Sequence, residues 1–290
     1  MNSGPDSKTA NADQIDYWNA TAGETWVALN ARLDRMIEPL GQAAMASLAP
    51  APGERVIDIG CGCGQTTREL AARVGETGRV LGVDVSAPML AVARDRAGRA
   101  GLTQASFLQA DAQTHAFEPG GADAVFSRFG VMFFADPVAA FANIRAALAP
   151  RGRLAFLCWR AVSENPMMAL PFAAALPHLP EAPSAPDPLA PGPFAFADGV
   201  RLCGILENAG FHDIVIAPHD QPISSGDLDE SVDTALRVGP LGAILRERPD
   251  LAGAVVEAVR AALAPFVTDA GVRLDSATWI VTARKENYAP

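Results

Sequence analysis

The stretch that decides the fold is VIDIGCGCG, residues 56–64, in which an apolar run passes directly into three alternating glycines. The apolar run predicts a buried strand, and the helical pattern QTTRELAARV at 65–74 follows the glycines. Glycines at a strand-to-helix turn let the backbone bend sharply and let a ligand approach the main chain and the N-terminus of the helix. The sequence therefore predicts a site for a nucleotide-like ligand at this turn.

Outward from this turn, short apolar runs alternate with longer helical patterns as far as residue 160. Such alternation is typical of repeated strand–helix–strand units and a parallel sheet. The expected strands cover 55–60, 79–86, 106–111, 123–129, 153–159, 211–217 and 278–284, and the expected helices cover 15–48, 65–74, 87–99, 199–209, a run from Pro137, and two or three stretches within 229–266.

Several segments lie outside these units. We expect residues 1–12 to form a disordered tail and residues 13–50 a helical cap that precedes the main domain, residues 51–290. Within the main domain, the Pro- and Ala-rich segment 163–198 and the helical segment 223–273 are expected to be insertions that form a lid over the sheet.

Composition narrows the class of protein. The chain has 290 residues, 49% of them hydrophobic, which is enough for one large core with a smaller helical cap. A formal net charge of −10 and scattered arginines disfavour a nucleic-acid partner. No apolar run approaches the roughly 20 residues of a membrane span, and the first residues lack signal-peptide features, so we expect a cytoplasmic protein without membrane insertion. The four cysteines match neither a disulfide framework nor a zinc site, so no metal is expected.

Three carboxylates are expected to converge. Asp58, Asp84 and Asp111 fall in or at the ends of three successive strands, at the carboxyl edge where open α/β sheets bind ligands. Asp84 is placed to accept both hydroxyls of a ribose, and Asp111 with the N–H of Ala112 could bind an adenine. Asp58 can help to place an ammonium group. Acids without a nearby Lys or Arg suit ammonium and sulfonium charges better than a pyrophosphate.

These motifs resemble those of the class I S-adenosylmethionine-dependent methyltransferases, especially the bacterial small-molecule branch similar to the quinone-biosynthesis methyltransferases. The resemblance implies an α/β, Rossmann-like sheet of seven strands, mostly parallel with an antiparallel last strand. It also implies S-adenosyl-L-methionine as the cofactor, under a helical N-terminal cap and lid insertions. It extends over about residues 17–284 and rests on VIDIGCGCG (56–64), GVDVS (82–86), QADAQ (109–113), SRFGVMFF (127–134) and LAPRGRLAF (148–156).

The resemblance also assigns cofactor-binding residues. Gly60, Gly62 and Gly64 would line the methionine and the ribose, Asp84 would bind the ribose, and Asp111 with Ala112 would bind the adenine. Two apolar side chains would pack on the faces of the adenine, although ordinary core packing explains them as well; these are Val85 and Met89.

Polar and aromatic residues near the reacting sulfonium are expected from two places. By resemblance, Ser127 and Arg128 would lie near the sulfonium or the methionine carboxylate, although an arginine there could equally form a surface ion pair. Tyr17, Trp18 and Trp26 lie on the expected N-terminal helices, where an aromatic face can attract a sulfonium and exclude water. Packing of the cap is the alternative explanation for these aromatic residues.

A general base is optional, because methyl transfer is a displacement at an already activated carbon. Among the four histidines, His178 is the candidate base, since the Pro-rich insertion that contains it is expected to cover the acceptor pocket; a surface histidine is the alternative. Arg128 is the other candidate for a catalytic role.

The predicted function is transfer of a methyl group to a small, apolar or aromatic organic acceptor by in-line displacement, with a homodimer also compatible with the sequence. Oxygen, nitrogen and carbon stay open as the methylated atom. One alternative is a nicotinamide-dependent oxidoreductase. The dinucleotide-binding fingerprint of such enzymes needs a third glycine at the position of Gln65, and its absence argues against this alternative. The other alternative is a non-catalytic, cofactor-binding scaffold protein of the same fold.

Overall fold

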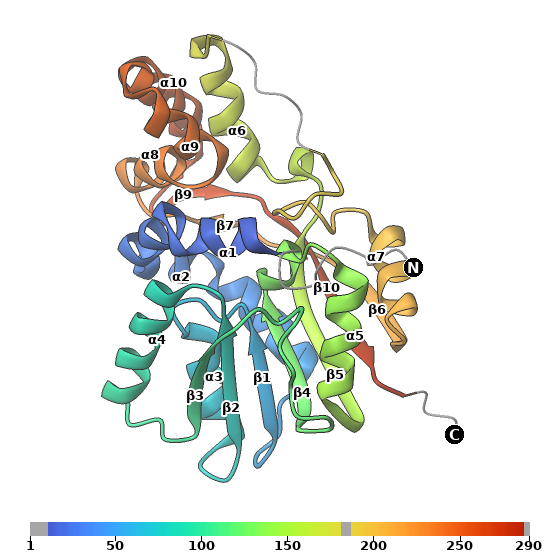
Figure 1. Cartoon of the computed structure of the whole chain (residues 1–290). Coiled ribbons are helices and arrows are strands. Elements are labelled where there is room, and N and C mark those ends of the chain that lie inside the picture. Colours follow the sequence, from blue (N-terminus) through green and yellow to red (C-terminus); the bar gives the residue numbers. More distant parts are fainter. Residues whose placement is uncertain (1–10, 181–186, 287–290) are drawn as a thin grey trace.

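The centre of the computed structural model, which describes residues 11–180 and 187–286, is a seven-stranded sheet (Figure 1). Its order is β3-β2-β1-β4-β5-β10-β6, and β10 runs antiparallel to both of its neighbours. The predicted α/β sheet with an antiparallel last strand is therefore confirmed. The strands are β1 (Arg55–Ile59), β2 (Arg79–Asp84), β3 (Ala105–Gln109), β4 (Ala122–Arg128), β5 (Leu148–Trp159), β6 (His212–Asp220) and β10 (Ala277–Arg284).

The strand order reverses between β1 and β4, and this reversal positions the ligand edge of the sheet. Strands β2 and β3 extend the sheet on one side of β1, whereas β4 and β5 extend it on the other. The loops that follow β1 and β4 approach so closely that a Cβ on Gly60 would lie 2.5 Å from the Cα of Gly130. Open α/β sheets bind their ligands at such a switch point.

Helices cover both faces of the sheet (Figure 1). On one side, α2 contacts both α3 and α4, and on the other, α5 packs with α7. Beneath the second pair lies an aromatic core, in which the ring of Phe141 is 5.4 Å from that of Phe156 and 6.0 Å from that of Phe196. The helices are α2 (Thr21–Leu48), α3 (Gln65–Val74), α4 (Ala87–Arg99), α5 (Pro137–Ala147) and α7 (Gly199–Asn208), with a 3-10 turn, η1 (Gly130–Phe133), after β4.

The N-terminal cap consists of α1 (Ala12–Asn19), which lies across the carboxyl edge of the sheet, and α2, which begins at that edge and runs down one face of the sheet, where its last residue, Leu48, contacts Arg153 of β5 (Figure 1). Residues 1–10 of the tail expected at 1–12 lie outside the described residues. For the last two positions the tail prediction is wrong, because Asn11 is buried and Ala12 begins α1. The start of the cap is thus part of the folded structure.

The two expected lid insertions fold together into one helical subdomain with its own apolar core. Ala175 from the first insertion and Val255 and Val259 from the second are fully buried in this core. A small sheet, β7-β9-β8, was not expected, because strands of two to four residues show no usable alternation of apolar and polar residues. The subdomain contains α6 (Pro166–Ala175), α8 (Leu228–Arg237), α9 (Gly239–Glu247), α10 (Ala252–Leu263), β7 (Ile223–Ser224), β8 (Val267–Thr268), β9 (Gly271–Leu274) and the 3-10 turns η2 (Val162–Glu164), η3 (Leu176–His178), η4 (Pro249–Leu251) and η5 (Ala264–Phe266).

Arg32 of α2 fastens the N-terminal cap to this subdomain. Its Nη1 donates to the carbonyl oxygen of Glu230 at 2.9 Å, to Asp233 Oδ2 at 2.9 Å and to Thr234 Oγ1 at 3.0 Å, all on α8. The neighbouring Arg35 reaches α8 only through an ion pair of 4.0 Å with Glu230. The cap and the lid should therefore move together.

We expect Arg32→Ala to lower the free energy of unfolding by about 1–2 kcal/mol, because it removes one cation that serves three acceptors. Hydrogen exchange of residues 228–263 should become faster in the same variant. The control is Arg35→Ala, which should change stability by less than about 0.5 kcal/mol, since its ion pair is long and exposed. Equal effects of the two variants in urea titrations would show that Arg32 does not anchor the subdomain.

Candidate functional site

The glycine loop between β1 and α3 leaves no room for side chains at its three glycines. Gly60, Gly62 and Gly64 have φ angles of 66°, 54° and 78°, a region that favours glycine. A Cβ at Gly62 would lie 2.8 Å from Met89 Cε, and a Cβ at Gly64 would lie 2.8 Å from Ala93 Cβ. Gly64 is the N-cap of α3 and offers no side chain to its first N–H groups, which suits a ligand at this helix end.

Asp84, at the end of β2, holds this loop. Its Oδ2 accepts from the N–H of Gly62 at 2.8 Å, and its Oδ1 accepts from the N–H of Ser86 at 2.8 Å. Burial raises the pKa of Asp84, whereas these two N–H donors oppose the rise. Since a carboxylate offers about four lone-pair positions, each oxygen of Asp84 can still accept from a ligand.

Asp58, in β1, fastens the first turn of α3 from below. Its Oδ2 accepts from Thr66 Oγ1 at 2.7 Å and from Thr67 Oγ1 at 2.6 Å. Its Oδ1 is buried without a partner among the described residues, as is the hydroxyl of Ser127 at the end of β4. Burial raises the pKa of Asp58 to about 6, against the lowering effect of both threonine hydroxyls and of Arg128.

Asp111 and Ala112 lie in the turn after β3, which ends at Gln109 rather than at residue 111 as expected. Asp111 Oδ1 accepts from the N–H of Gln113 at 2.9 Å and from Asn11 Nδ2 at 3.3 Å. The three predicted carboxylates thus follow three adjacent strands at one edge of the sheet, in the order β3, β2, β1.

Helix α1 is fastened to the loop after β2 by hydrogen bonds that the sequence did not reveal. Ser86 is the N-cap residue of α4, but its hydroxyl makes no cap bond and instead donates to the carbonyl of Trp18 at 2.8 Å. Asn19 Nδ2 donates to the carbonyl of Val85 at 2.9 Å, and its Oδ1 accepts from the N–H of Ala87 at 2.9 Å. No periodic pattern indicates such contacts, because each joins residues more than sixty positions apart.

The aromatic residues of the cap meet around Trp18. Its ring lies edge-on to Tyr17 at 5.3 Å, to Trp26 at 5.8 Å and to Phe133 at 5.2 Å. Trp26 also packs against the main core. This cluster joins the cap to the 3-10 turn after β4, so the packing role that was considered for these residues is present in the structure.

A second aromatic contact lies at the ends of β4 and β5. Phe129 stacks on Trp159 with ring centres 4.2 Å apart and planes 12° apart. Phe129 has a φ of 66°, which is uncommon for a bulky residue and costs energy. Residues held in this way cluster at functional sites, which marks the end of β4 as part of the site.

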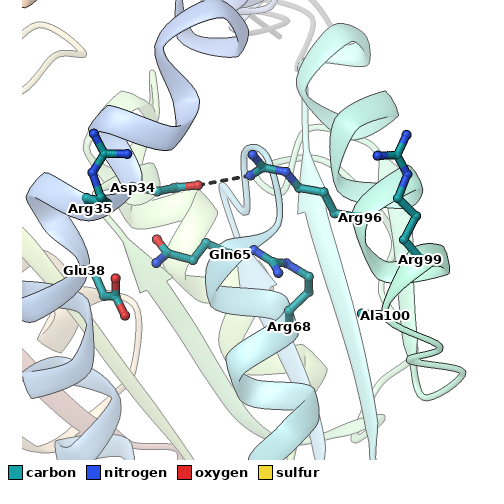
Figure 2. A pocket seen from close by; sticks show the side chains of 8 residues that line it. All are labelled: Asp34, Arg35, Glu38, Gln65, Arg68, Arg96, Arg99 and Ala100. Atoms are coloured by element: carbon teal, nitrogen blue, oxygen red, sulfur yellow. Dashed lines mark hydrogen bonds and ion pairs between the residues drawn. The ribbon is translucent and has the colours of Figure 1, made fainter.

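Arg128 lies in an ion-pair network between the helices. Its Nη2 is 3.1 Å from Asp34 Oδ1, and its Nη1 donates to Gln65 Oε1 at 2.7 Å. The other oxygen of Asp34 is 3.3 Å from Arg96 Nη1 (Figure 2). Arg128 therefore ties α2 to α3, and Asp34 extends the network to α4; the ion pair is largely buried, unlike the surface ion pair that was the alternative to a contact with the cofactor.

A groove of 490 Å³ lies on this helical face (Figure 2). None of the residues predicted to bind the cofactor lines it. Its lining consists of Asp34, Arg35, Glu38, Gln65, Arg68, Arg96, Arg99 and Ala100.

The structure does not bring His178 to the glycine loop. It is exposed in the turn η3 after α6, and this end of α6 points away from the sheet (Figure 1). Phe172, in the same insertion, packs against the core of the helical subdomain. The proposed base role of His178 gains no support from this placement.

Residues 56–152, from β1 into β5, match a family model described as a methyltransferase domain. This part of the chain is a methyltransferase domain. The domain contains the glycine loop and all three predicted carboxylates. The aklanonic acid methyltransferase DauC of Streptomyces sp. (strain C5) is 37% identical over 118 residues, which are 41% of this chain and 54% of DauC.

A second relative is the ubiquinone/menaquinone biosynthesis C-methyltransferase UbiE of Ectopseudomonas mendocina (strain ymp). It is 40% identical over 109 residues, which are 37% of this chain and 42% of UbiE. The chain thus spans about half the length of the curated relatives it matches. Phosphoethanolamine N-methyltransferase 2 of Haemonchus contortus, solved with S-adenosyl-L-methionine, has a similar fold, with a TM-score of 0.61 at 19% identity over 94% of this chain and 60% of that chain.

Over residues 56–152, the part of the chain that the family model matches, the predicted relationship to the class I S-adenosylmethionine-dependent methyltransferases is confirmed. None of the helices in the described ranges combines the length and apolar character needed to cross a bilayer. The individual cofactor contacts, the acceptor, the homodimer and the cytoplasmic location stay predictions.

The raised pKa of Asp58 predicts a pH dependence of stability. An unfolded Asp has a pKa of about 3.9, so the folded protein favours the protonated carboxyl, and this contribution to the free energy of unfolding should fall as the pH rises from about 4 to about 6. The loss should be on the order of 2–3 kcal/mol, since one pKa unit corresponds to about 1.4 kcal/mol. Urea titrations at several pH values should therefore show that Asp58→Asn lacks this fall.

The control is Asp123→Asn, which should act with the opposite sign. Arg55 holds the pKa of Asp123 below its ordinary value, so that contribution is lost as the pH falls. If wild type and Asp58→Asn share one pH profile between pH 4 and 7, Asp58 is ionised throughout and the argument from burial is wrong.

Proposed function

We propose that this protein binds S-adenosylmethionine along the carboxyl ends of β1, β2 and β3 and transfers its methyl group to a small, apolar or aromatic acceptor. The observation that carries the proposal is the hydrogen bond of Asp84 to the glycine loop, with Asp58 and Asp111 at the two strands beside β2, inside a methyltransferase domain. Sheet edges of this kind bind nucleotide-like ligands.

The charges and unpartnered atoms of the site suit this cofactor. Asp58 Oδ1 is fully buried without a partner and can accept from an ammonium group. Asp84 can accept from both ribose hydroxyls while it holds the glycine loop. Arg128 lowers the pKa of Asp58, but its ion pair is with Asp34, and the ion pairs of the described residues include none with Asp58, Asp84 or Asp111, so the site favours a cationic ligand over a pyrophosphate.

The acceptor is proposed from the surface beside these carboxylates. Phe129 and Trp159, which are 9% and 7% exposed, stack at the ends of β4 and β5 and give this part of the site an apolar, planar lining. The relatives named for aklanonic acid and for ubiquinone and menaquinone biosynthesis support a small organic acceptor. We therefore favour an acceptor with an aromatic or similarly flat apolar body.

The chain's own residues would act mainly by alignment and by exclusion of water. Bound S-adenosylmethionine supplies a methyl group that is already activated by its sulfonium. Ser86 and Asn19 hold α1 over the loop after β2, and Arg32 links the cap to the lid, so that bulk water is kept from the site. No histidine is assigned as a base, since His178 is exposed and distant from this edge.

The nicotinamide-dependent oxidoreductase is disfavoured by the role of Gln65. At the position where the dinucleotide fingerprint needs glycine, this buried side chain accepts a hydrogen bond from Arg128. The non-catalytic alternative makes a different prediction, namely cofactor binding without turnover.

Calorimetry should detect binding of S-adenosylhomocysteine, the demethylated cofactor, and no comparable binding of NAD. Asp84→Asn should weaken the binding at least tenfold, because about 1.4 kcal/mol gives that factor and a hydrogen bond to a charged group contributes about 1.5–3 kcal/mol. The control is Asp95→Asn, an exposed carboxylate on α4, which should bind as wild type does.

Turnover should be measured as release of S-adenosylhomocysteine from S-adenosylmethionine with a panel of phenols and quinols. Tight NAD binding without S-adenosylhomocysteine binding would overturn the proposed function. Cofactor binding without release of product across the panel would favour the non-catalytic alternative.

A further inference from the structure

Asn11 occupies the N-cap of α1 but does not cap the helix. An asparagine at this position ordinarily accepts a hydrogen bond from an N–H of the first turn and stabilises the helix by about 1 kcal/mol. Here the side chain makes no cap bond, and its Nδ2 donates to Asp111 Oδ1 at 3.3 Å. The side chain of Asn11 therefore contacts the loop after β3 instead of the first turn of its own helix.

The carbonyl oxygen of the same side chain is buried and has no partner. Asn11 is 6% exposed, and its Oδ1 makes no hydrogen bond within the described residues. Gln14 lies three residues further along the same face of α1, and its Oε1 is also buried without a partner. A buried acceptor without a donor costs about 1–3 kcal/mol, so such atoms call for an explanation, which a bound ligand can supply.

Asp111, the hydrogen-bond partner of Asn11, also has an oxygen that can accept from a ligand. Asp111 uses Oδ1 for Asn11 and for the N–H of Gln113, which leaves Oδ2 for a ligand. Asp111 Oδ2, Asn11 Oδ1 and Gln14 Oε1 are all acceptors. An exocyclic amino group carries two N–H donors and can serve two of them at once.

The far end of α1 is held independently of this cluster. Ser86 and Asn19 fasten its C-terminal end to the loop after β2, whereas the contact of Asn11 with Asp111 joins its N-terminal end to the loop after β3. A ligand amino group beside Asp111 would therefore complete the closure of the cap at this end.

We propose that Asn11 is a specificity-determining residue, whose side-chain carbonyl accepts from the amino group of adenine and, with Asp111, selects adenine over hypoxanthine. This inference rests on the proposed binding of S-adenosylmethionine and goes beyond it, because it assigns recognition of the base to the N-terminal cap.

The test compares two ligands, S-adenosylhomocysteine and S-inosylhomocysteine, in which a ring carbonyl replaces the amino group. Calorimetry on the wild-type protein should show at least a tenfold preference for the adenine ligand. Asn11→Ala should weaken S-adenosylhomocysteine severalfold and S-inosylhomocysteine little, so that the preference shrinks at least threefold.

The matched control is Asn19→Ala, which removes the other amide side chain that fastens α1. It should weaken both ligands by the same factor and leave the preference unchanged. If Asn11→Ala also weakens both ligands equally, Asn11 only fastens the helix and the inference is wrong, while the proposed function stands. A wild-type protein that binds neither ligand would overturn the proposed function and this inference together.

Discussion

The close approach of the loops after β1 and β4 is the constraint on which the site depends. A Cβ on Gly60 would lie 2.5 Å from the Cα of Gly130, so the chain can connect the two halves of the sheet here only with bare backbone on both sides. The same contact brings the glycine loop to the switch point of the strand order. Asp84 then fixes the loop through the N–H of Gly62.

Around this constraint the chain separates its charges. The carboxylates of Asp58, Asp84 and Asp111 follow adjacent strands at the ligand edge, whereas Arg128 is drawn away to Asp34 between the helices. A site whose carboxylates form no ion pair with the described residues favours a ligand that brings donors and positive charge. This separation explains why the motif of a nucleotide site occurs here without the features of a phosphate site.

The main sheet could be predicted from the sequence because its signal is local. Each strand is a short apolar run, and the glycines at 60, 62 and 64 and the proline at 137 mark a turn or a helix start within a few residues. The positions of Asp58, Asp84 and Asp111 at the carboxyl edge could be predicted as well, because they depend only on where these strands end. What could not be predicted depends on contacts between distant residues.

Arg128 illustrates such a contact, because its partner Asp34 lies 94 positions away and no pattern connects the two. The contact of Asn11 with Asp111 also joins distant residues, so the sequence does not indicate it. The polar N-terminus by itself predicts a tail. The expectation that His178 covers the acceptor pocket has a similar origin, because the Pro- and Ala-rich sequence of the insertion does not indicate a core of its own. In the structure, apolar residues of α6 pack with α10 into a separate core, and this packing carries the end of α6 away from the sheet.

The central claim is that the carboxyl edge of β1, β2 and β3 holds S-adenosylmethionine, and a crystal structure with S-adenosylhomocysteine tests it most directly. The expected result places the ribose hydroxyls on Asp84, the amino acid end beside Asp58 and the adenine beside Asp111. A ligand found in the charged groove between α2, α3 and α4, or a ribose held without Asp84, would contradict the claim.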